Sequence, residues 1–319
     1  MENLGTELVK YWDFDPNSLR LLAERENTIY CADTQDRKFV IRKHRTGYHS
    51  KVSIQSELML MDALKAQNCR LPAAMRSKDA NFVIEHNGEY FTAISWVEGE
   101  TMSHILANAP EPADVSNIYH DLGIALAQFH EAADNWQPPA QFQRHKWDRN
   151  GLVGEQPVWS RFWDNPDLLP DERYTLIKVQ DQMNEALSHL EGTLDYGLIH
   201  ADLIPDNVMI DQGQITFLDF DDCGFGFRLF DIATILLKQI ETDDFQDKAQ
   251  ALMQGYRTRR DLDARFVLMF LVLRSLTYVG WIMDRPNIEN ASARSRHFIE
   301  RARFLSEQFM GAPKREQGV

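Results

Sequence analysis

The sequence predicts an α+β protein whose first hundred residues are mainly strands and whose remainder is mainly helical. Short runs of β-branched and aromatic residues, separated by turn-forming residues, fill the N-terminal part. Beyond residue 99, apolar residues recur at helical spacing over long segments. The chain has 319 residues, of which 44% are hydrophobic, so it can bury a substantial core as one large domain or two lobes.

The N-terminal part contains three single strand signals, one helix signal and one hairpin signal. Residues 19–23 and 28–32 are short strands around a polar break, and residues 38–43, KFVIRK, form a third strand. Residues 53–66 place apolar side chains at helical spacing and predict a helix. Residues 81–97 predict a hairpin that turns at His86-Asn87-Gly88. The break at Glu98-Gly99-Glu100 then divides the chain into lobes at 1–98 and 99–319.

The C-terminal part alternates helical segments with one long irregular stretch. Residues 115–129 carry a regular apolar stripe, and helical spacing returns at 171–190 and again from residue 230 onward. Between the first two helices, residues 135–170 are rich in Trp, Pro and Gly and predict a long functional loop. Residues 208–220 predict a tight hairpin with its turn at Asp211-Gln212-Gly213.

Composition excludes several classes of protein. A net charge of −14 argues against a general nucleic-acid binder, whose binding faces are basic. Three dispersed cysteines (Cys31, Cys69 and Cys223) argue against a disulfide framework or structural zinc, and favour a reducing cytoplasm. The N-terminus has no apolar signal region, and the apolar run 266–273 is too short to span a bilayer. We therefore expect a soluble cytoplasmic protein without a membrane partner.

Four polar residues carry the predicted chemistry. Asp202 and Asn207 lie in the stretch HADLIPDNV, directly after the apolar run YGLI. Asp219 ends the second strand of the predicted hairpin, and Asp231 follows twelve positions later, where it opens the helical run DIATILL. Because a hairpin returns the chain on itself, Asn207 and Asp219 should meet at its open end, where their oxygens suit Mg²⁺. Asp202 could accept a proton from a hydroxyl group. Phosphoryl transfer needs both parts, a metal that neutralises phosphate charge and a carboxylate that orients the attacking oxygen.

The combined pattern HADLIPDN…FLDFDDCGFGFRLFDIA resembles the aminoglycoside-phosphotransferase and choline-kinase-like superfamily, which is related to protein kinases. Within it, HADLIPDNV is most similar to the homoserine-kinase-like branch, and LDFDDCGFG with DIA to the stress-response-kinase-like branch. The resemblance implies a bilobal protein-kinase-like fold, with an N-terminal lobe that binds ATP and a C-terminal lobe with the catalytic loop and acceptor site.

The resemblance also implies a role for each residue of the pattern. Asp202 would be the catalytic base or orienting carboxylate, and Asn207 and Asp219 would hold Mg²⁺. His200 and Asp231 would support the catalytic loop, although Asp231 could instead be a simple helix N-cap. Asp221 adds a further carboxylate, which could touch a second metal ion or the acceptor.

In the N-terminal lobe, the resemblance places ATP against a strand-borne cation that is paired with a helix glutamate. The positions that match are Arg42 and Glu57, with Lys43 as the alternative cation and an ordinary surface ion pair as the plainer explanation. The turn 24–28 would cover the phosphates without a GxGxxG pattern. The segment AISWVEG resembles the hinge, where the backbone of Ser95 and Val97 would contact the adenine.

The acceptor site has weaker candidates. Trp147 and Asp148 belong to the Trp-rich loop, which is either a packed loop or a wall of the acceptor pocket. Arg274, Tyr278 and Trp281 lie on a C-terminal helix, where core packing is the competing explanation.

The expected function is ATP- and Mg²⁺-dependent phosphorylation of a hydroxyl group on a small molecule, such as an amino acid, an amino alcohol, a sugar or an aminoglycoside-like compound. A protein Ser/Thr kinase of the stress-response type is the alternative, although no HRD, DFG or APE sequence is present. A non-catalytic nucleotide-binding regulator is the third hypothesis. The sequence leaves the acceptor and the oligomeric state open.

Overall fold

The computed structural model describes residues 2–24, 26–108, 111–313 and 317. It divides into two compact units, each assembled from several segments. Unit 1 comprises Met1–Ile105, Asn135–Arg144 and Asp206–Asp221. Unit 2 comprises Leu106–Asp134, His145–Pro205 and Asp222–Val319. The first segment of unit 1 thus extends past residue 98, and two later segments pack with the N-terminal strands. The functional lobe boundary at 98 stays a prediction.

As predicted, most of the elements before residue 99 are strands, and helices predominate after it. The strands are β1 (Arg20–Glu24), β2 (Thr28–Asp33), β3 (Lys38–Lys43), β4 (Ala74–Met75), β5 (Ile84–His86), β6 (Glu89–Ser95), β7 (Glu100–Thr101), β8 (His145–Trp147), β9 (Tyr196–Ile199), β10 (Val208–Asp211), β11 (Gln214–Phe217) and β12 (Gly224–Phe227). The α-helices are α1 (Glu2–Leu8), α2 (Lys51–Ala66), α3 (Met102–Ala107), α4 (Pro112–Asp134), α5 (Arg149–Val153), α6 (Pro170–Leu190), α7 (Arg228–Leu237), α8 (Phe245–Arg257), α9 (Val267–Trp281) and α10 (Ala291–Gly311). Short 3₁₀ turns are η1 (Pro16–Ser18), η2 (Phe162–Asp164), η3 (Pro205–Asn207), η4 (Ala264–Phe266) and η5 (Ile282–Asp284).

Unit 1 is built on an antiparallel sheet with strand order β1-β2-β3-β6-β4, in which β5 also pairs with β6. Alternation along β3 sends Phe39 and Ile41 to one face, where they join a core that includes Leu8 and Trp12. Helix α1 therefore packs on this face. Helix α1 was not predicted from the sequence, because seven residues are too few to show a helical period.

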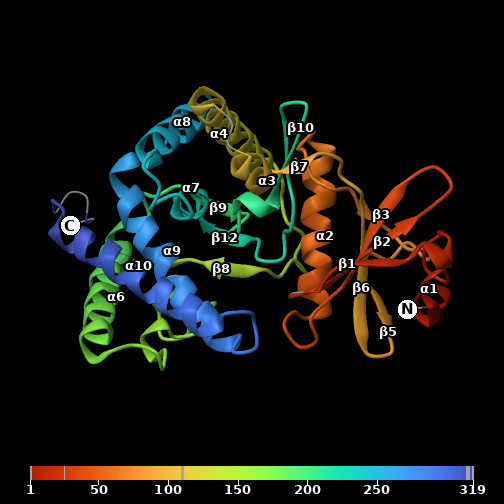
Figure 1. The fold of residues 1–319 in the computed structure, drawn as a ribbon, viewed down its shortest axis with the longest axis horizontal. Helices are drawn as coiled ribbons and strands as arrows, with labels where there is room; N and C mark the ends of the chain where they lie inside the picture. The colour runs from red at the N-terminus through yellow and green to blue at the C-terminus, as the bar shows by residue number, and fades with distance from the viewer. Residues whose placement is uncertain (1, 25, 109–110, 314–316, 318–319) are drawn as a thin grey trace. The chain divides into compact units, whose positions relative to one another are not determined.

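Helix α2 lies on the other side of the sheet from α1 (Figure 1). The side chain of Ser50 accepts a hydrogen bond from the Ser53 N–H and caps its N-terminus. Ile54, Leu58 and Leu64 are fully buried, as their spacing predicted. The strands predicted at 28–32 and 38–43 and the hairpin at 86–88 are also confirmed. Residue 25 of the predicted phosphate-covering turn lies outside the described residues.

A second sheet in unit 1 has the strand order β11-β10-β7. The β10–β11 hairpin turns at Gln212 and Gly213, whose φ angles of 48° and 78° are those of a type I′ turn. The predicted hairpin is thus confirmed, with one correction. Strand β11 ends at Phe217, so Asp219 lies two residues beyond the strand and does not end it.

Unit 2 contains a small sheet of order β8-β12-β9, in which β8 runs parallel to β12. Strand β8, helix α5 and the turn η2 lie within residues 135–170, so the prediction of one long irregular loop there was wrong. The elements are too short to show a period in the sequence. The helices predicted at 115–129 and 171–190 are confirmed as α4 and α6.

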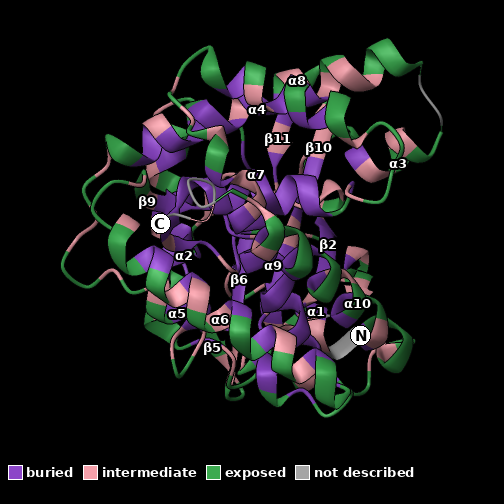
Figure 2. Cartoon of the chain, turned by 90° about the vertical axis from the view of Figure 1, so that its left-hand side faces the viewer, coloured by how far each residue is buried: buried purple, intermediate pink, exposed green. Residues whose placement is uncertain are grey.

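Helices α7 and α9 form the centre of unit 2, and Figure 2 shows them largely buried. Every residue of α7 is buried, as is every residue of α9 from Met269 to Gly280. The apolar run 266–273 belongs to a longer helical stretch, Ala264–Asp284, which by length and composition alone passes as a membrane span. However, 78% of its most apolar window is buried inside the protein, which is the property of a core helix.

Candidate active site

A buried ion pair joins the sheet of unit 1 to helix α2. Arg42 on β3 lies on the face opposite to Phe39 and Ile41, and its guanidinium donates to the carboxylate of Glu57. The side chains are only 6% and 1% exposed, which excludes an ordinary surface pair. Lys43 instead pairs with Glu89, 2.9 Å away. Of the two cations considered from the sequence, Arg42 is the one held against the helix glutamate.

Two further carboxylates face the same arginine. Arg42 Nη1 lies 3.5 Å from Asp219 Oδ1 and 3.8 Å from Asp221 Oδ1. The Asp219 side chain is half exposed, whereas that of Asp221 is buried beside the imidazole of His49. One guanidinium thus meets three carboxylates, and the cluster has an excess of negative charge.

Burial and charge set the protonation states in this cluster. Burial opposes the charge of the Arg42 guanidinium, but the three surrounding carboxylates outweigh it and raise the Arg42 pKa. Burial alone would raise the pKa of Asp221, but the His49 imidazole and the Arg42 guanidinium lower it well below its ordinary range. Burial and the Arg42 charge hold the pKa of His44 well below its ordinary value. His44 is therefore neutral at pH 7, while the carboxylate of Asp221 is ionised.

Asn207 and Asp219 flank the open end of the β10–β11 hairpin, as the sequence predicted. Val208 pairs with Phe217, and the next pair outward is closed by a 2.8 Å hydrogen bond from the Leu218 N–H to the Asn207 carbonyl. The residue after Leu218 is Asp219, which has a left-handed φ of 57°. Such a conformation is uncommon for an aspartate and is found at functional sites more often than elsewhere.

The residues at this end fit a divalent cation. In the described part of the chain, no cluster of three or more His, Cys, Asp or Glu side chains could hold a metal by itself. Mg²⁺ in phosphate sites, however, uses one or two carboxylates and takes its other ligands from phosphate and water. The Asp219 carboxylate and the Asn207 amide oxygen are hard donors of this kind, next to a cluster with surplus negative charge.

Arg144 was missed by the sequence analysis, although it holds the Asp219–Asp221 loop in place. Its Nη2 donates to the carbonyl oxygens of Phe220 (3.2 Å) and Asp221. Its Nη1 donates to the carbonyl and the hydroxyl oxygen of Ser53 on α2, both at 3.2 Å. The same guanidinium therefore connects α2 to the acidic loop. These acceptors are mostly backbone atoms, which leave no sequence signal.

In unit 2, Asp231 supports the loop that carries His200 and Asp202. Its two carboxylate oxygens accept hydrogen bonds from the backbone N–H groups of His200 (2.9 Å) and Ala201 (2.7 Å). Helix α7 begins at Arg228, so the suggestion that Asp231 is its N-cap was wrong. Asp231 binds the backbone of another segment, and its supporting role is visible in the contacts.

This support is completely buried. His130 on α4 lies 3.1 Å from Asp231 Oδ2 through Nε2 and 2.8 Å from the Tyr256 hydroxyl through Nδ1. Burial raises the pKa of Asp231 to about 6, although the backbone hydrogen bonds from His200 and Ala201 oppose it. Burial, followed by the charge of Arg228, lowers the His130 pKa well below its ordinary value.

Within the same loop, Ala201 and Asp202 are held in defined positions. Ala201 is fully buried and has a left-handed φ of 67°, which is strained for a residue with a Cβ. The Asp202 N–H donates to His200 Nδ1 at 3.3 Å. The Asp202 carboxylate receives a 2.8 Å hydrogen bond from Nη2 of Arg274, a fully buried residue of α9. Arg274, predicted as an acceptor-site residue, thus contacts the predicted catalytic carboxylate.

The remaining acceptor-site candidates occupy different environments in unit 2. Trp147 is fully buried, stacks on Phe230 at 5.3 Å and donates its indole N–H to the Asp222 carbonyl. Asp148 accepts from the Gly151 N–H and caps α5. Trp281, at the end of α9, is partly exposed. None of these contacts tests the predicted acceptor roles, which stay predictions.

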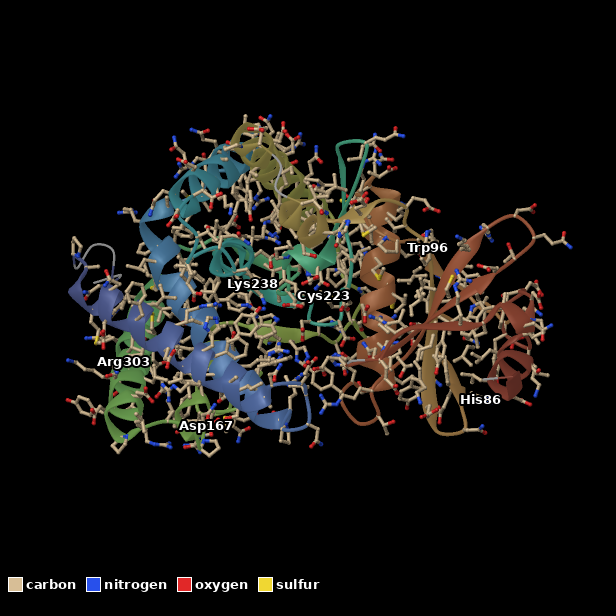
Figure 3. All side chains as sticks on the ribbon, viewed as in Figure 1. His86, Trp96, Asp167, Cys223, Lys238 and Arg303 are labelled. Carbon is tan, nitrogen blue, oxygen red and sulfur yellow. The ribbon has the colours of Figure 1, made fainter. Side chains whose placement is uncertain are left out.

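The predicted hinge follows strand β6. Figure 3 labels Trp96 just beyond the end of this strand and His86 at its opposite end, at the β5–β6 turn. The Ser95 N–H donates to the Ala73 carbonyl at 2.9 Å, and the Ser95 hydroxyl accepts from the Ala73 N–H at 2.8 Å. The Ser95 N–H is therefore already used within unit 1. A contact of Ser95 or Val97 with adenine stays a prediction.

A strand-borne arginine paired with a helix glutamate, acidic residues at the end of a hairpin, and an HxD loop are together the parts of a kinase-like phosphotransferase. The chain belongs to the phosphotransferase enzyme family (APH), whose model matches residues 18–271. It is therefore an enzyme of the kinase and phosphotransferase class, and the predicted resemblance is confirmed.

Two relatives show the range of the family. The chain is 24% identical over 302 residues to an amicoumacin kinase of Bacillus subtilis (strain 168). This alignment covers 88% of this chain and 84% of that protein. It is 27% identical over 247 residues to a homoserine kinase of Acidiphilium cryptum (strain JF-5), which covers 75% of this chain and 70% of that protein. The predicted similarity to homoserine kinases is thus confirmed.

Solved structures confirm the kinase-like α+β fold. A microcompartment-associated aminopropanol kinase superposes with a TM-score of 0.83 and 26% identity, covering 99% of this chain and 98% of that one. An amicoumacin kinase in complex with AMP-PNP and Ca²⁺ superposes with a TM-score of 0.77 and 19% identity, covering 96% and 93% of the two chains. At this level of identity, the second likeness concerns the fold alone.

Proposed function

We propose that this protein transfers the γ-phosphoryl group of ATP, with Mg²⁺, to a hydroxyl group of a small molecule. The observation that carries the proposal is the cluster of Arg42 with Glu57, Asp219 and Asp221 in unit 1. Its cation suits phosphate oxygens, and its surplus of carboxylates suits a divalent metal ion. Membership of the phosphotransferase family supports the same reaction.

In this mechanism the acceptor oxygen forms a bond to the γ-phosphorus while the bond from that phosphorus to the β–γ bridging oxygen breaks, and ADP leaves. The hydroxyl proton passes to the Asp202 carboxylate. Asp202 also orients the hydroxyl, and Asp231 keeps the loop in shape through its two backbone hydrogen bonds. Arg42, which is fixed by Glu57, steadies the phosphates.

Mg²⁺ would be held by Asn207 and Asp219. When bound, it would neutralise the charge of the β- and γ-phosphates. A nucleotide and a divalent ion together are present in the amicoumacin kinase complex, which shares the fold.

The acceptor is proposed from the relatives. A homoserine kinase and an aminopropanol kinase, by their names, act on small compounds that carry a hydroxyl and an amino group. We therefore place amino alcohols and hydroxy amino acids first among the acceptors, ahead of sugars and aminoglycosides.

The test is a coupled ADP-release screen of the purified protein with Mg²⁺ and ATP against amino alcohols, hydroxy amino acids, sugars and aminoglycosides. We expect turnover that depends on one class of acceptor, and a loss of about 10³-fold or more in Asp202→Ala with nucleotide still bound. Undiminished turnover in Asp202→Ala would refute the assignment. Radiolabel transferred from ATP to protein bands, with no small acceptor active, would support the protein-kinase alternative. ATP binding without any turnover would support the regulator.

A further inference from the structure

Arg274 makes an unusual set of contacts in unit 2. It is fully buried, and its Nη2 donates both to Asp202 Oδ1 at 2.8 Å and to the Tyr278 hydroxyl at 3.0 Å. In the described residues, its Nε and Nη1 atoms are buried and have no hydrogen-bond partner. A buried cation with so few hydrogen bonds depends strongly on its counterion. The ion pair with Asp202 is therefore the main compensation for burying this charge.

Aromatic rings surround the guanidinium of Arg274. Its central carbon lies 4.7 Å from the ring centroid of Trp159, 5.2 Å from that of Phe230 and 4.4 Å from that of Tyr278. Gly280 makes this arrangement possible, because a Cβ at that position would lie 2.0 Å from the Trp159 carbonyl oxygen. The three rings already serve a cation of the protein itself. They are thus not a free cage for an ammonium group of the acceptor.

We propose that Arg274 is a positioning residue for Asp202, which holds the carboxylate ionised and fixes its orientation toward the acceptor hydroxyl. This inference rests on the proposed function, in which Asp202 receives the hydroxyl proton. The Asp202 side chain is 22% exposed, so one part of it faces Arg274 while another stays accessible. The ring cage prevents the guanidinium from turning away, and the carboxylate therefore keeps a single orientation.

The pairing also defines when Asp202 takes the proton. Protonation of Asp202 would leave the buried Arg274 charge without its counterion, which is unfavourable. Proton transfer is therefore expected late, after the bond to phosphorus has largely formed, as a loose phosphoryl-transfer transition state allows. Among the described groups that act on Asp202 are Arg274 and Tyr278 from α9 and the His200 imidazole, which accepts from the Asp202 N–H in the same loop. The Asp231 carboxylate lies under the loop backbone.

The test compares Arg274→Met and Arg274→Lys with wild type in the pH dependence of kcat. Without the neighbouring positive charge, Asp202 protonates at higher pH. We therefore expect the acidic limb of the kcat profile of Arg274→Met to move up by about one pH unit or more. We also expect kcat to fall about 100-fold with the KM for ATP unchanged within about threefold. Arg274→Lys keeps the charge and loses the planar fork, so its acidic limb should stay while kcat falls about tenfold.

Arg285→Met is the matched control, because Arg285 is also buried and its guanidinium carbon lies 4.2 Å from the centroid of an aromatic ring, that of Trp281. A purely structural role would lower the thermal midpoint and kcat of Arg274→Met but leave the acidic limb unchanged. That result, or an equal shift of the limb in Arg285→Met, overturns the proposal. If Arg274→Met does not fold, Arg274→Lys decides, since wild-type kcat in that variant also overturns it.

A second measurement separates this inference from the proposed function. The side-chain carboxyl carbons of aspartate are labelled with ¹³C, and Asp202→Asn identifies the Asp202 signal. In Arg274→Met we expect this signal to titrate at higher pH than in wild type, whereas in Arg274→Lys, which keeps the charge, it should titrate as in wild type. An unchanged titration in Arg274→Met contradicts the inference even in the absence of any acceptor. If wild type transfers phosphate to none of the acceptors while the titration moves, the proposed function fails and the pairing stands.

Discussion

Each unit buries one arginine against a carboxylate that we assign to catalysis, but the two surroundings differ. Arg42 in unit 1 faces three carboxylates, those of Glu57, Asp219 and Asp221. Among the described residues, Arg274 in unit 2 forms an ion pair with one carboxylate, that of Asp202, and lies against three aromatic rings. The first cluster therefore has three carboxylates around one guanidinium, and the second pairs one carboxylate with one guanidinium.

The two surroundings indicate which ligands each cluster is suited to bind. Surplus carboxylates at a partly exposed position, such as Asp219, favour a divalent cation and the polyphosphate that comes with it. A neutral ion pair in an aromatic cage neither needs nor attracts a further ion, and it is suited to hold one carboxylate still. We thus expect variants in unit 1 to alter nucleotide and metal affinity, and variants at Asp202 to alter the chemical step.

The largest expected effect tests this division directly. Asp219→Asn and Asp202→Asn should each lower kcat by about 10³-fold. Only Asp219→Asn should also weaken the binding of a non-hydrolysable ATP analogue in the presence of Mg²⁺, because it removes a proposed metal ligand. Isothermal titration calorimetry measures that affinity. Equal losses of affinity in both variants would remove the distinction between the two clusters.

A smaller effect is expected at Arg42. Arg42→Met leaves three carboxylates without their buried cation, so we expect the KM for ATP to rise by about 100-fold and the protein to be destabilised by about 3 kcal/mol or more. Arg42→Lys retains the charge and should lose about tenfold in KM only. Lys43→Met is the control, since Lys43 pairs with Glu89 and not with this cluster. A larger rise of KM in Lys43→Met would transfer the phosphate role to Lys43.

A third prediction concerns the loop that carries Asp219. Arg144→Met removes the hydrogen bonds that connect Ser53 to the carbonyls of Phe220 and Asp221. We expect the Mg²⁺ concentration for half-maximal activity to rise about tenfold, because the loop is no longer held for the metal. Ser53→Ala is the matched control, as it removes one acceptor and leaves the Ser53 carbonyl. Unchanged Mg²⁺ dependence in Arg144→Met would show that the loop keeps its shape without this residue.

The sequence predicted the parts of the site that depend on local periodicity. Helical spacing placed Glu57 on α2, and the tight turn placed Asn207 and Asp219 at one end of a hairpin. Strand alternation separated Arg42 from Lys43, but the preference for Arg42 came from the resemblance. These arrangements follow from the period of a strand, a helix or a turn, so a single sequence suffices to derive them.

The parts that could not be predicted depend on tertiary contacts. Arg144 lies in a segment without a period and binds mostly backbone carbonyls, which any residue supplies. Arg274 and Asp202 are 72 positions apart, and nothing in the sequence around either residue indicates that the two form an ion pair. Asp231 was assigned to support the loop by resemblance, but its hydrogen bonds to the N–H groups of another segment emerge only once α7 packs beneath that loop.

The smallest expected effect concerns Asp231, the buried carboxylate that supports the loop of Asp202. Burial raises the pKa of Asp231 from its ordinary value near 3.8 to about 6. A raised pKa stabilises the folded state fully below about pH 4, and this contribution is lost as the pH rises through 6. The difference in free energy of unfolding between wild type and Asp231→Asn should therefore fall by about 2 kcal/mol from pH 4 to pH 7.

Urea unfolding of both proteins across this pH range, followed by tryptophan fluorescence, measures the difference. The prediction concerns how this difference in free energy of unfolding changes with pH. Its absolute value is no test, because Asp231→Asn also disturbs a backbone hydrogen bond. The neutral His130 is present in both proteins and contributes equally. Asp263→Asn is the control of opposite sign, since the Arg265 guanidinium lowers the pKa of Asp263, and its small contribution is lost as the pH falls. The prediction fails if the difference in free energy of unfolding between wild type and Asp231→Asn rises with pH, as it should for Asp263→Asn. The Asp231 carboxylate under the catalytic loop would then be stabilised as an anion, like that of Asp221 in unit 1.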